Sequence, residues 1–572
     1  MKVWLIYYTA LLSVTGYGIL PAEAALSREG KAIDENEQPF SPLGTNWKLT
    51  QTPPPSEQLS PSPSEIPLPD TETPLLTPDA TVRVNAVNVV GSTVFSEDDF
   101  AEVISFLIGK EATFEDLLAI RSAITNLYTS QGYTTSGAFL PPQDVSNGVI
   151  TVQVIEGELE EIEIEGLIRL NESYVRSRLA LAGKAPVNIN QLEESLQLLQ
   201  LNPLFERVQA ELKAGTSPGK SILILSLTEA PAFSAAYLVE NRDSPSVGSV
   251  RHNAILTHQN LLGWGDNLSF QAGFTEGVDS YNINYEIPVN PRNGIVEFRY
   301  SKNDQVVIEE PFNPLDLVSH SENISLGFRQ PLIYTPTQEF TLGLSATLRE
   351  SQTFLFEDIP FSFSLGPENG ESRVTVLRLS QDWTQRSLNR VVAVRSQFNV
   401  GIDAFNATIN EDAPDGRFFS WIGQFQWVQA LNEQGVVAIS RLTTQLTPDS
   451  LLPLEQFSIG GIDTVRGYRQ NQRVADNGIV GSVEVRFPIV NKPDGVGLVQ
   501  VAPFFDVGTV WNNESEVTSP NTLVSTGVGL RWQINPGFEA RLDWGIPLNE
   551  IEQPSNTLQD NGIFFSIFYQ PS

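Results

Sequence analysis

The stretch Gly460-Gly461-Ile462-Asp463-Thr464-Val465-Arg466-Gly467-Tyr468 places a glycine-flanked arginine between two strand-like regions near the C-terminus. Further on, Phe504-Phe505-Asp506-Val507-Gly508 alternates so that Asp506 lies on the opposite face from its two apolar neighbours. A loop arginine that reached a carboxylate on the inner wall of a barrel would form a charge-assisted hydrogen bond in a partly desolvated lumen. The alternative is a polar turn with a solvated arginine, so the rest of the chain has to decide between them.

Strand-like segments separated by Gly, Asn, Asp and Pro turns fill the chain from about Ala232 to its end. Apolar and polar residues alternate cleanly in the segments 267–274, 296–300, 483–487, 528–532 and 539–544. A soluble sandwich also alternates, but it buries its apolar faces against a second sheet and rarely needs so many strands. We estimate about sixteen strands, an even number within the range of outer-membrane barrels. Residues 231–572 are therefore predicted to form an all-β, antiparallel transmembrane barrel.

In such a barrel the apolar face meets lipid and the charged face lines the lumen. Pairs such as Glu297 with Arg299 and Glu484 with Arg486 suit a wet interior. The long segment from about 447 to 477 is predicted to be a loop between strands that carries Arg466 towards Asp506.

The N-terminal part has two segments without a packed core. Lys2, an apolar run over residues 3–20 and Ala22-Glu23-Ala24 predict a signal peptide over residues 1–24. Residues 25–81 are polar and then Pro-rich, which predicts an extended tether. Residues 25–38 could form only a short helix, which Gly30 interrupts and Pro39 ends.

Two copies of a β-α-α-β-β order follow, over residues 82–157 and 158–230. In the first copy, Ser96 is predicted to cap one helix, and Thr113 with Asp116 to form the capping box of the next. In the second copy, helices are predicted after Asn171 and from Asn190.

Composition excludes several classes of function. The 68 acidic residues against 35 basic ones give a net charge of −33, which argues against a nucleic-acid partner. The chain has no cysteine and three histidines, at 252, 258 and 320, which form no metal-binding spacing. We therefore assign no metal, cofactor or catalytic residue and expect no enzyme.

Two motifs that suggest other chemistry have a simpler explanation. The phosphate-loop-like pattern at 214–221 is followed by a strand and not by the helix that would bind phosphate, so we interpret it as a hairpin turn. The pair Glu160-Glu161 lies at a strand junction without a neighbouring histidine, and we interpret it as solvated surface.

In this order, the two repeats, the barrel and the two short motifs resemble the outer-membrane transporters of two-partner secretion, the TpsB or haemolysin secretion/activation family. That family belongs to the POTRA-barrel superfamily of outer-membrane assembly factors. Residues 82–157 and 158–230 resemble POTRA domains, the second of the ShlB type. Val465-Arg466-Gly467-Tyr468 matches the V-R-G-F/Y of the superfamily's inward loop, and Phe504, Asp506 and Gly508 match its F-x-D-x-G strand.

The resemblance implies protein transport across the outer membrane of a Gram-negative-type cell. POTRA domains in the periplasm would capture an unfolded exoprotein, such as an adhesin, haemolysin or toxin, which would cross the barrel to the surface. Arg466 would be the loop-tip residue and Asp506 its wall partner. Outer-membrane lipids and the barrel-assembly machinery, which would insert the chain, are further implied partners.

The main alternative is an assembly factor that inserts other barrels and shares both motifs. Its relatives usually carry more POTRA repeats, so two repeats favour secretion. Family members often also place a helix before the first POTRA as a plug in the barrel, and the short helix possible at 25–38 makes a plug doubtful here.

Overall fold

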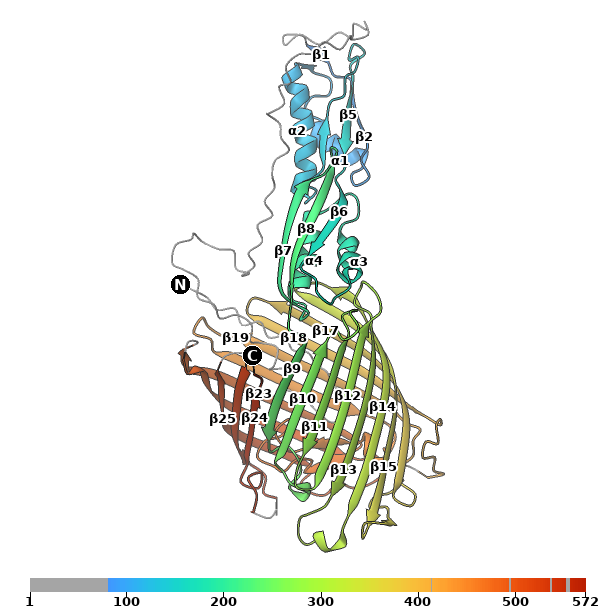
Figure 1. Cartoon of the computed structure of the whole chain (residues 1–572), viewed down its shortest axis with the longest axis vertical. Helices are drawn as coiled ribbons and strands as arrows, with labels where there is room; N and C mark the ends of the chain where they lie inside the picture. The colour runs from blue at the N-terminus through green and yellow to red at the C-terminus, as the bar shows by residue number, and fades with distance from the viewer. Residues whose placement is uncertain (1–80, 413, 493–494, 535–536, 552–555, 572) are drawn as a thin grey trace. The chain divides into compact units, whose positions relative to one another are not determined.

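The computed structural model of the chain describes residues 81–412, 414–492, 495–534, 537–551 and 556–571 (Figure 1). They belong to two units that meet in the chain between Ala230 and Pro231. The predicted signal peptide, the short helix considered for 25–38 and the predicted tether up to residue 80 lie outside the described residues.

The first repeat, residues 82–155, is a small α+β domain. Its elements are β1 (Val82–Arg83), β2 (Ala86–Val90), α1 (Glu97–Ile104), β3 (Glu111–Ala112), α2 (Phe114–Ser130), β4 (Gly137–Phe139) and β5 (Val149–Ile155). The central strand β5 pairs in parallel with β2 and antiparallel with β4. Both helices begin with the predicted capping residues: Ser96 accepts from the N–H of Asp99, and Thr113 from that of Asp116. The buried face of α2 shares one apolar core with β5.

The second repeat has the same design. Its elements are β6 (Glu158–Glu165), α3 (Glu172–Ala182), α4 (Ile189–Gln200), β7 (Phe205–Ala214) and β8 (Lys220–Glu229). The sheet order is β6-β8-β7, so β6 is an edge strand that pairs in parallel with β8. A separate core lies between this sheet and both helices.

Two details of the second repeat test the sequence interpretation. The predicted start of α4 at Asn190 is wrong: the extended residue Asn188 is the cap, and its side chain accepts from the N–H groups of Asn190 and Gln191. The glycine-rich pattern at 214–221 joins β7 to β8 as a turn, with Gly219 at φ 81°, which confirms the hairpin interpretation.

The carboxylate of Glu156, just before the second repeat begins, is hydrogen-bonded to two other parts of the first repeat. Glu156 accepts from the N–H of Thr93 at 2.7 Å and from the hydroxyl of Tyr128 at 2.9 Å. Burial raises the pKa of Glu156, but the hydrogen bonds from Thr93, Tyr128 and Val94 outweigh it, so the pKa lies below its usual value. Across the junction, the N–H of Ile189 donates to the carbonyl of Gly132 at 2.9 Å. The two repeats therefore touch through backbone as well as being adjacent in sequence.

The second unit is a closed antiparallel barrel. In the part of the chain that the structure describes, sixteen strands close the ring. They are β9 (Phe233–Glu240), β10 (Arg251–Gln259), β11 (Asn267–Phe274), β12 (Val278–Pro288), β13 (Ile295–Val306), β14 (Val318–Tyr334), β15 (Gln338–Leu355), β17 (Glu371–Ser387), β18 (Arg390–Ile402), β19 (Phe419–Ala430), β20 (Val437–Leu446), β23 (Asn477–Lys492), β24 (Gly497–Trp511), β25 (Thr522–Ile534), β26 (Phe538–Pro547) and β27 (Ile563–Tyr569). The last strand, β27, pairs with the first, β9, which closes the ring. The short strand β16 (Ile359–Pro360) pairs with the end of β15. This confirms the predicted barrel.

The strands keep the predicted alternation. On β24, Phe505 and Val507 are 46% and 39% exposed on the outer face, whereas Phe504 and Asp506 are buried on the inner face. The predicted inward pairs are also formed: Glu297 contacts Arg299, and Glu484 accepts from Arg486 at 2.8 Å. Period-two alternation therefore decides which side chains line the lumen. Among the described residues, no helix is both long enough and apolar enough to cross a membrane.

Candidate functional site

A single inward loop carries the predicted arginine. It covers residues 447–476, between β20 and β23, and contains a hairpin of β21 (Phe457–Ile459) and β22 (Arg473–Ala475). Gly460 and Gly461 have φ of 107° and 99°, and a Cβ on either would lie within 3 Å of the returning chain at Arg469 or Gln470. These two glycines therefore permit the tight entry into the loop tip.

The tip arginine is bound to the barrel wall through a carboxylate of β24. Arg466 donates from Nε to one oxygen of Asp506 at 2.8 Å and from Nη2 to the other at 2.9 Å. The backbone N–H of Arg466 also donates to this carboxylate, at 3.1 Å. Arg466 is 4% exposed and Asp506 is 0% exposed. A bidentate, buried pair of this kind fixes the orientation of the loop tip as well as its position.

Further charged side chains extend this pair into a network, which we name the Arg466 network. Arg466 also donates to Glu484 of β23 at 2.6 Å and to Asp543 of β26 at 3.4 Å. Arg531 of β25 donates to the same two carboxylates, at 2.9 Å and 2.8 Å. Arg486 and Arg541 contact Glu484 and Asp543 as well. Side chains of three strands, β23, β24 and β26, thus hold one loop residue directly, and β25 completes the network through Arg531. Each buried charge has a partner of the opposite sign.

The β24 motif contacts the loop along one face of the strand. The guanidinium carbon of Arg466 lies 3.4 Å from the centre of the Phe504 ring, a cation–π contact. A Cβ at Gly508 would lie 3.0 Å from Val465 Cγ2, so glycine leaves room for that side chain. Residues 504, 506 and 508 face the same way because strand side chains alternate. The spacing of the motif therefore matches its three contacts.

The last two residues of the loop motif contact backbone groups of the barrel, Gly467 through its own backbone and Tyr468 through its hydroxyl. Gly467 has φ of 95°, and its backbone lies against Gly545 of β26. The Tyr468 hydroxyl donates to the carbonyl of Val524 at 2.8 Å and accepts from the N–H of Asn549 at 3.1 Å. Tyr468 is 1% exposed. The structure thus brings all seven predicted residues, 465–468 with 504, 506 and 508, into one site.

Other loop residues form ion pairs that the sequence analysis missed. Arg469 donates to Asp560 and, at 3.0 Å, to Glu309. Asp463 lies 2.9 Å from Arg242, and Glu455 contacts two arginines of the wall. The partners lie far away in the sequence, and no motif marks them. The inward face of an alternating strand could have indicated Arg349 and Arg378, but many side chains share that signal. The other partners lie in loops, where alternation gives no signal.

Two of the carboxylates in these ion pairs have lowered pKa values. Burial raises the pKa of Glu455, but the guanidinium groups of Arg378 and Arg349 outweigh it and hold the pKa below its usual value. Burial also raises the pKa of Asp560, but the hydrogen bonds from Arg469 and Thr557 and the charge of Arg469 together outweigh it, so the pKa lies below its usual value. Both carboxylates are therefore charged at neutral pH and bind the arginines as ion pairs.

The described residues contain no group of three or more His, Asp or Glu side chains arranged to hold a metal ion. Two of the three histidines make polar contacts: His252 forms a hydrogen bond with the Tyr237 hydroxyl, and His320 contacts Asp304. The chemistry of the site is that of ion pairs that hold a loop inside a barrel.

Comparison with protein families gives two matches. Residues 219–532 match the model of the family described as haemolysin secretion/activation protein ShlB/FhaC/HecB. Residues 82–157 match the POTRA domain of the ShlB type.

Individual proteins agree with these matches. The outer membrane transporter CdiB of Escherichia coli strain 536 is 24% identical over 546 residues, which cover 92% of this chain and 87% of that protein. The heme/hemopexin transporter protein HuxB of Haemophilus influenzae strain 86-028NP is 26% identical over 266 residues, 43% of this chain and 44% of that protein. The solved structure of CdiB from Escherichia coli has the same fold, with a TM-score of 0.67 at 22% identity over 88% of this chain and 93% of that one.

Proposed function

The chain belongs to the haemolysin secretion/activation protein family ShlB/FhaC/HecB, and we propose that it recognises one exoprotein in the periplasm and moves it, unfolded, through its barrel to the cell surface. It is an outer-membrane transporter of the two-partner secretion type, with POTRA domains in the periplasm. Recognition of the cargo, its path and the roles of the site residues are the parts that we propose.

The observation that carries the proposal is the loop held inside the lumen by Arg466. Only three residues separate β8 from β9, so the barrel end at which β9 begins opens to the compartment of the repeats. Strand direction alternates around the ring, and β20 has the same direction as β9. Loop 447–476 therefore enters the lumen from the surface side, where an exported chain would leave.

Arg466 would keep the loop tip on the wall while the cargo passes. Four strands contribute to its network, so the tip can act as a fixed point within a lumen that has to change shape. Val465, Gly467 and Tyr468 would support that position, and Phe504, Asp506 and Gly508 would receive it.

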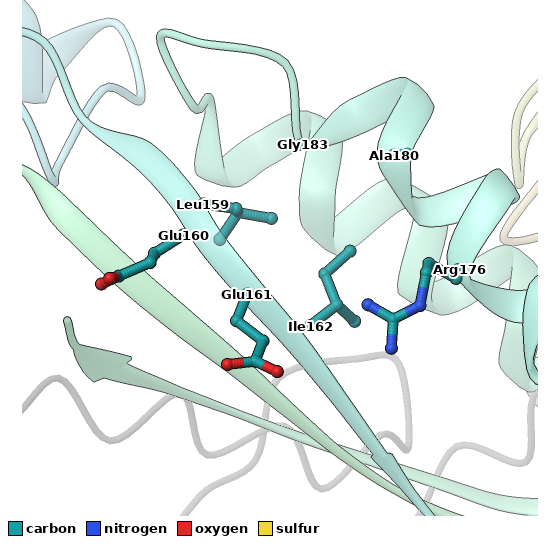
Figure 2. Close-up of a pocket in the computed structure, with 7 residues that line it drawn as sticks. All are labelled: Leu159, Glu160, Glu161, Ile162, Arg176, Ala180 and Gly183. Atoms are coloured by element: carbon teal, nitrogen blue, oxygen red, sulfur yellow. The ribbon is translucent and has the colours of Figure 1, made fainter. Parts of the chain in front are cut away.

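For cargo recognition we propose the groove between β6 and α3 in the second repeat (Figure 2). It is lined by Leu159, Glu160, Glu161, Ile162, Arg176, Ala180 and Gly183. β6 pairs on one side with β8 and has a free edge on the other. An extended segment of the exoprotein could add to this edge as a strand and place alternate side chains in the groove.

The charge of β6 indicates which segment would fit. Among the described residues, the side-chain carboxylates of Glu161, Glu163 and Glu165 have no hydrogen-bond or ion-pair partner. By contrast, Glu160 is occupied, because it accepts from the N–H of Thr216 at 2.9 Å. A docking segment with Lys or Arg at alternate positions would neutralise the three remaining carboxylates. Capture of the exoprotein would then weaken with added salt.

The test is secretion of the exoprotein encoded beside this gene, in cells with and without this protein. Surface abundance of unrelated outer-membrane barrels is followed in the same cells. We expect loss of that one exoprotein from the medium with the other barrels unchanged. A general fall in outer-membrane barrels would contradict the proposal and support the assembly-factor alternative.

A further inference from the structure

Loop 447–476 is attached to the barrel at a second place, away from the Arg466 network. We name residues 447–456 the loop arm; it ends in the short helix η3 (Pro453–Glu455). Glu455 is 8% exposed and accepts from Arg349 of β15 at 2.9 Å and from Arg378 of β17 at 2.8 and 3.0 Å. One loop carboxylate is thus held by two arginines of the wall.

Apolar packing reinforces this attachment. Leu451 and Leu452 of the arm are each 1% exposed. They share a buried cluster with Val374 and Val376 of β17 and with Phe418, which precedes β19. The arm therefore covers an apolar strip of the wall next to the two arginines.

The two attachments lie on different parts of the ring. Four strands separate β17, which holds Glu455, from β24, which holds Arg466 through Asp506, and ten separate them the other way round. The loop consequently spans the lumen between its two attachments. Release of one attachment would widen the path for an exported chain.

Release of the tip would leave more buried charge unpaired than release of the arm. Among the described residues, Asp506 has one basic partner, Arg466, and Asp506 is 0% exposed. An unpaired buried carboxylate is strongly unfavourable. On the other side, Arg378 keeps a second acceptor, Asn399 at 3.0 Å, after Glu455 leaves. Glu455 and the two arginines can then be hydrated in the open lumen.

We propose that Glu455 is the positioning residue that keeps the lumen closed, and that the arm leaves β15 and β17 during transport while the Arg466 network holds the tip. The exported chain then passes between the arm and this wall, where its apolar side chains replace Leu451 and Leu452. The path of the cargo depends on the proposed function, whereas closure of the lumen by Glu455 does not.

The first test measures ion conductance of the full-length protein in planar bilayers. Glu455→Gln keeps the shape of the side chain and removes its charge. We expect the open fraction to rise about tenfold, as for the loss of a charge-assisted hydrogen bond. Arg378→Gln should act in the same direction, and the double variant should add little to either single one, because both remove the same contact. Glu433→Gln, in the exposed turn between β19 and β20, is the matched control and should match the wild type.

The second test locks the arm. Asp415 and Leu451 are direct partners in a backbone bridge, a separation that a disulfide can span, and the natural chain has no cysteine. Asp415→Cys with Leu451→Cys should abolish secretion and lower conductance when oxidised, and reduction should restore both. Ser325→Cys with Thr347→Cys is the matched control: these residues face each other across β14 and β15, with their hydroxyls 3.2 Å apart, and neither belongs to the loop.

Normal secretion by the oxidised lock, at normal surface abundance, would overturn the inference, and so would an unchanged open fraction in both charge variants. If Glu455→Gln fails to insert, the reversible lock decides alone. Failure of the proposed function would give a different result. The Glu455→Gln substitution and the disulfide between positions 415 and 451 would still change the conductance, but the wild-type protein would secrete no exoprotein.

Discussion

Gly467 at the loop tip and Gly545 on β26 touch backbone to backbone. A Cβ on Gly545 would lie 2.5 Å from the backbone nitrogen of Gly467, and one on Gly467 would lie 3.0 Å from the carbonyl of Gly545. Neither neighbour is the end of a flexible side chain, so neither can move aside alone. The close approach places the adjacent Arg466 within reach of β23, β24 and β26.

Gly545→Ala should therefore displace the loop tip. We expect a loss of about 1–3 kcal/mol in stability, as for overpacking of a filled site, together with a several-fold fall in secretion. Thermal unfolding of the purified barrel and secretion at equal surface abundance are the measurements. Gly495→Ala is the control, because no atom lies within 4 Å of a Cβ there. If the two variants had equal stability and equal secretion, the contact between Gly467 and Gly545 would not be needed to position the loop tip.

Arg466→Ala should leave a folded barrel at the surface and abolish secretion. The change strands the buried carboxylate of Asp506, and breaking a buried ion pair costs about 3–5 kcal/mol. The strand ladder of the barrel does not depend on the loop, so insertion should persist. Secretion is compared with surface abundance measured by protease accessibility. Arg417→Ala, which removes an exposed arginine paired locally with Asp415, serves as the control. Normal secretion by Arg466→Ala would contradict the proposed role of the tip.

Reversal of charge on the edge strand should impair cargo capture. Replacing Glu161, Glu163 and Glu165 with Lys turns the free edge of β6 from acidic to basic while the pairing with β8 persists. We expect at least about tenfold weaker binding of the exoprotein's secretion domain, since like charges across paired strands are unfavourable. Binding is measured by calorimetry at two salt concentrations. The matched control replaces Glu102, Glu115 and Glu206 with Lys. These three glutamates are exposed and lie outside β6, so the change in net charge is the same. Unchanged binding by the β6 variant would exclude this edge as the docking site.

The junction carboxylate should make the repeats sensitive to acid. The pKa of Glu156 is lowered in the folded state, so its contribution to stability is fully present above the usual pKa of about 4.5 and is lost as the pH falls through the lower folded value. Glu156→Gln should therefore destabilise residues 81–230 at pH 7, and the difference from the wild type should shrink below about pH 4.5. These residues have two cores of their own, so the segment can be studied separately.

Urea unfolding followed by circular dichroism at pH 7 and pH 3.5 measures this difference. Glu206→Gln, which removes an exposed carboxylate without a hydrogen-bond partner among the described residues, should show no such pH dependence. A difference between Glu156→Gln and the wild type that stays constant with pH would contradict the role assigned to the carboxylate.

Local patterns predicted most of the architecture because they act over a few residues. The caps at Ser96 and Thr113 were recognised since a capping box needs two residues three positions apart. The start of α4 was placed wrongly because Asn188 and Asn190 are both suitable caps. Backbone geometry at Asn188, next to the contact of Ile189 with Gly132, selects between them.

The sequence by itself determined the two repeats, the alternating barrel and the inward face of Asp506, because helix caps, turns and period-two alternation are encoded by neighbouring residues. The tertiary structure alone decided that Glu455 meets Arg349 and Arg378, that Arg469 meets Asp560, and that Gly467 touches Gly545. These partners are far apart in the chain. Closure of the ring and the inward fold of one loop bring them together, and Coulomb attraction and steric fit act only after they have met.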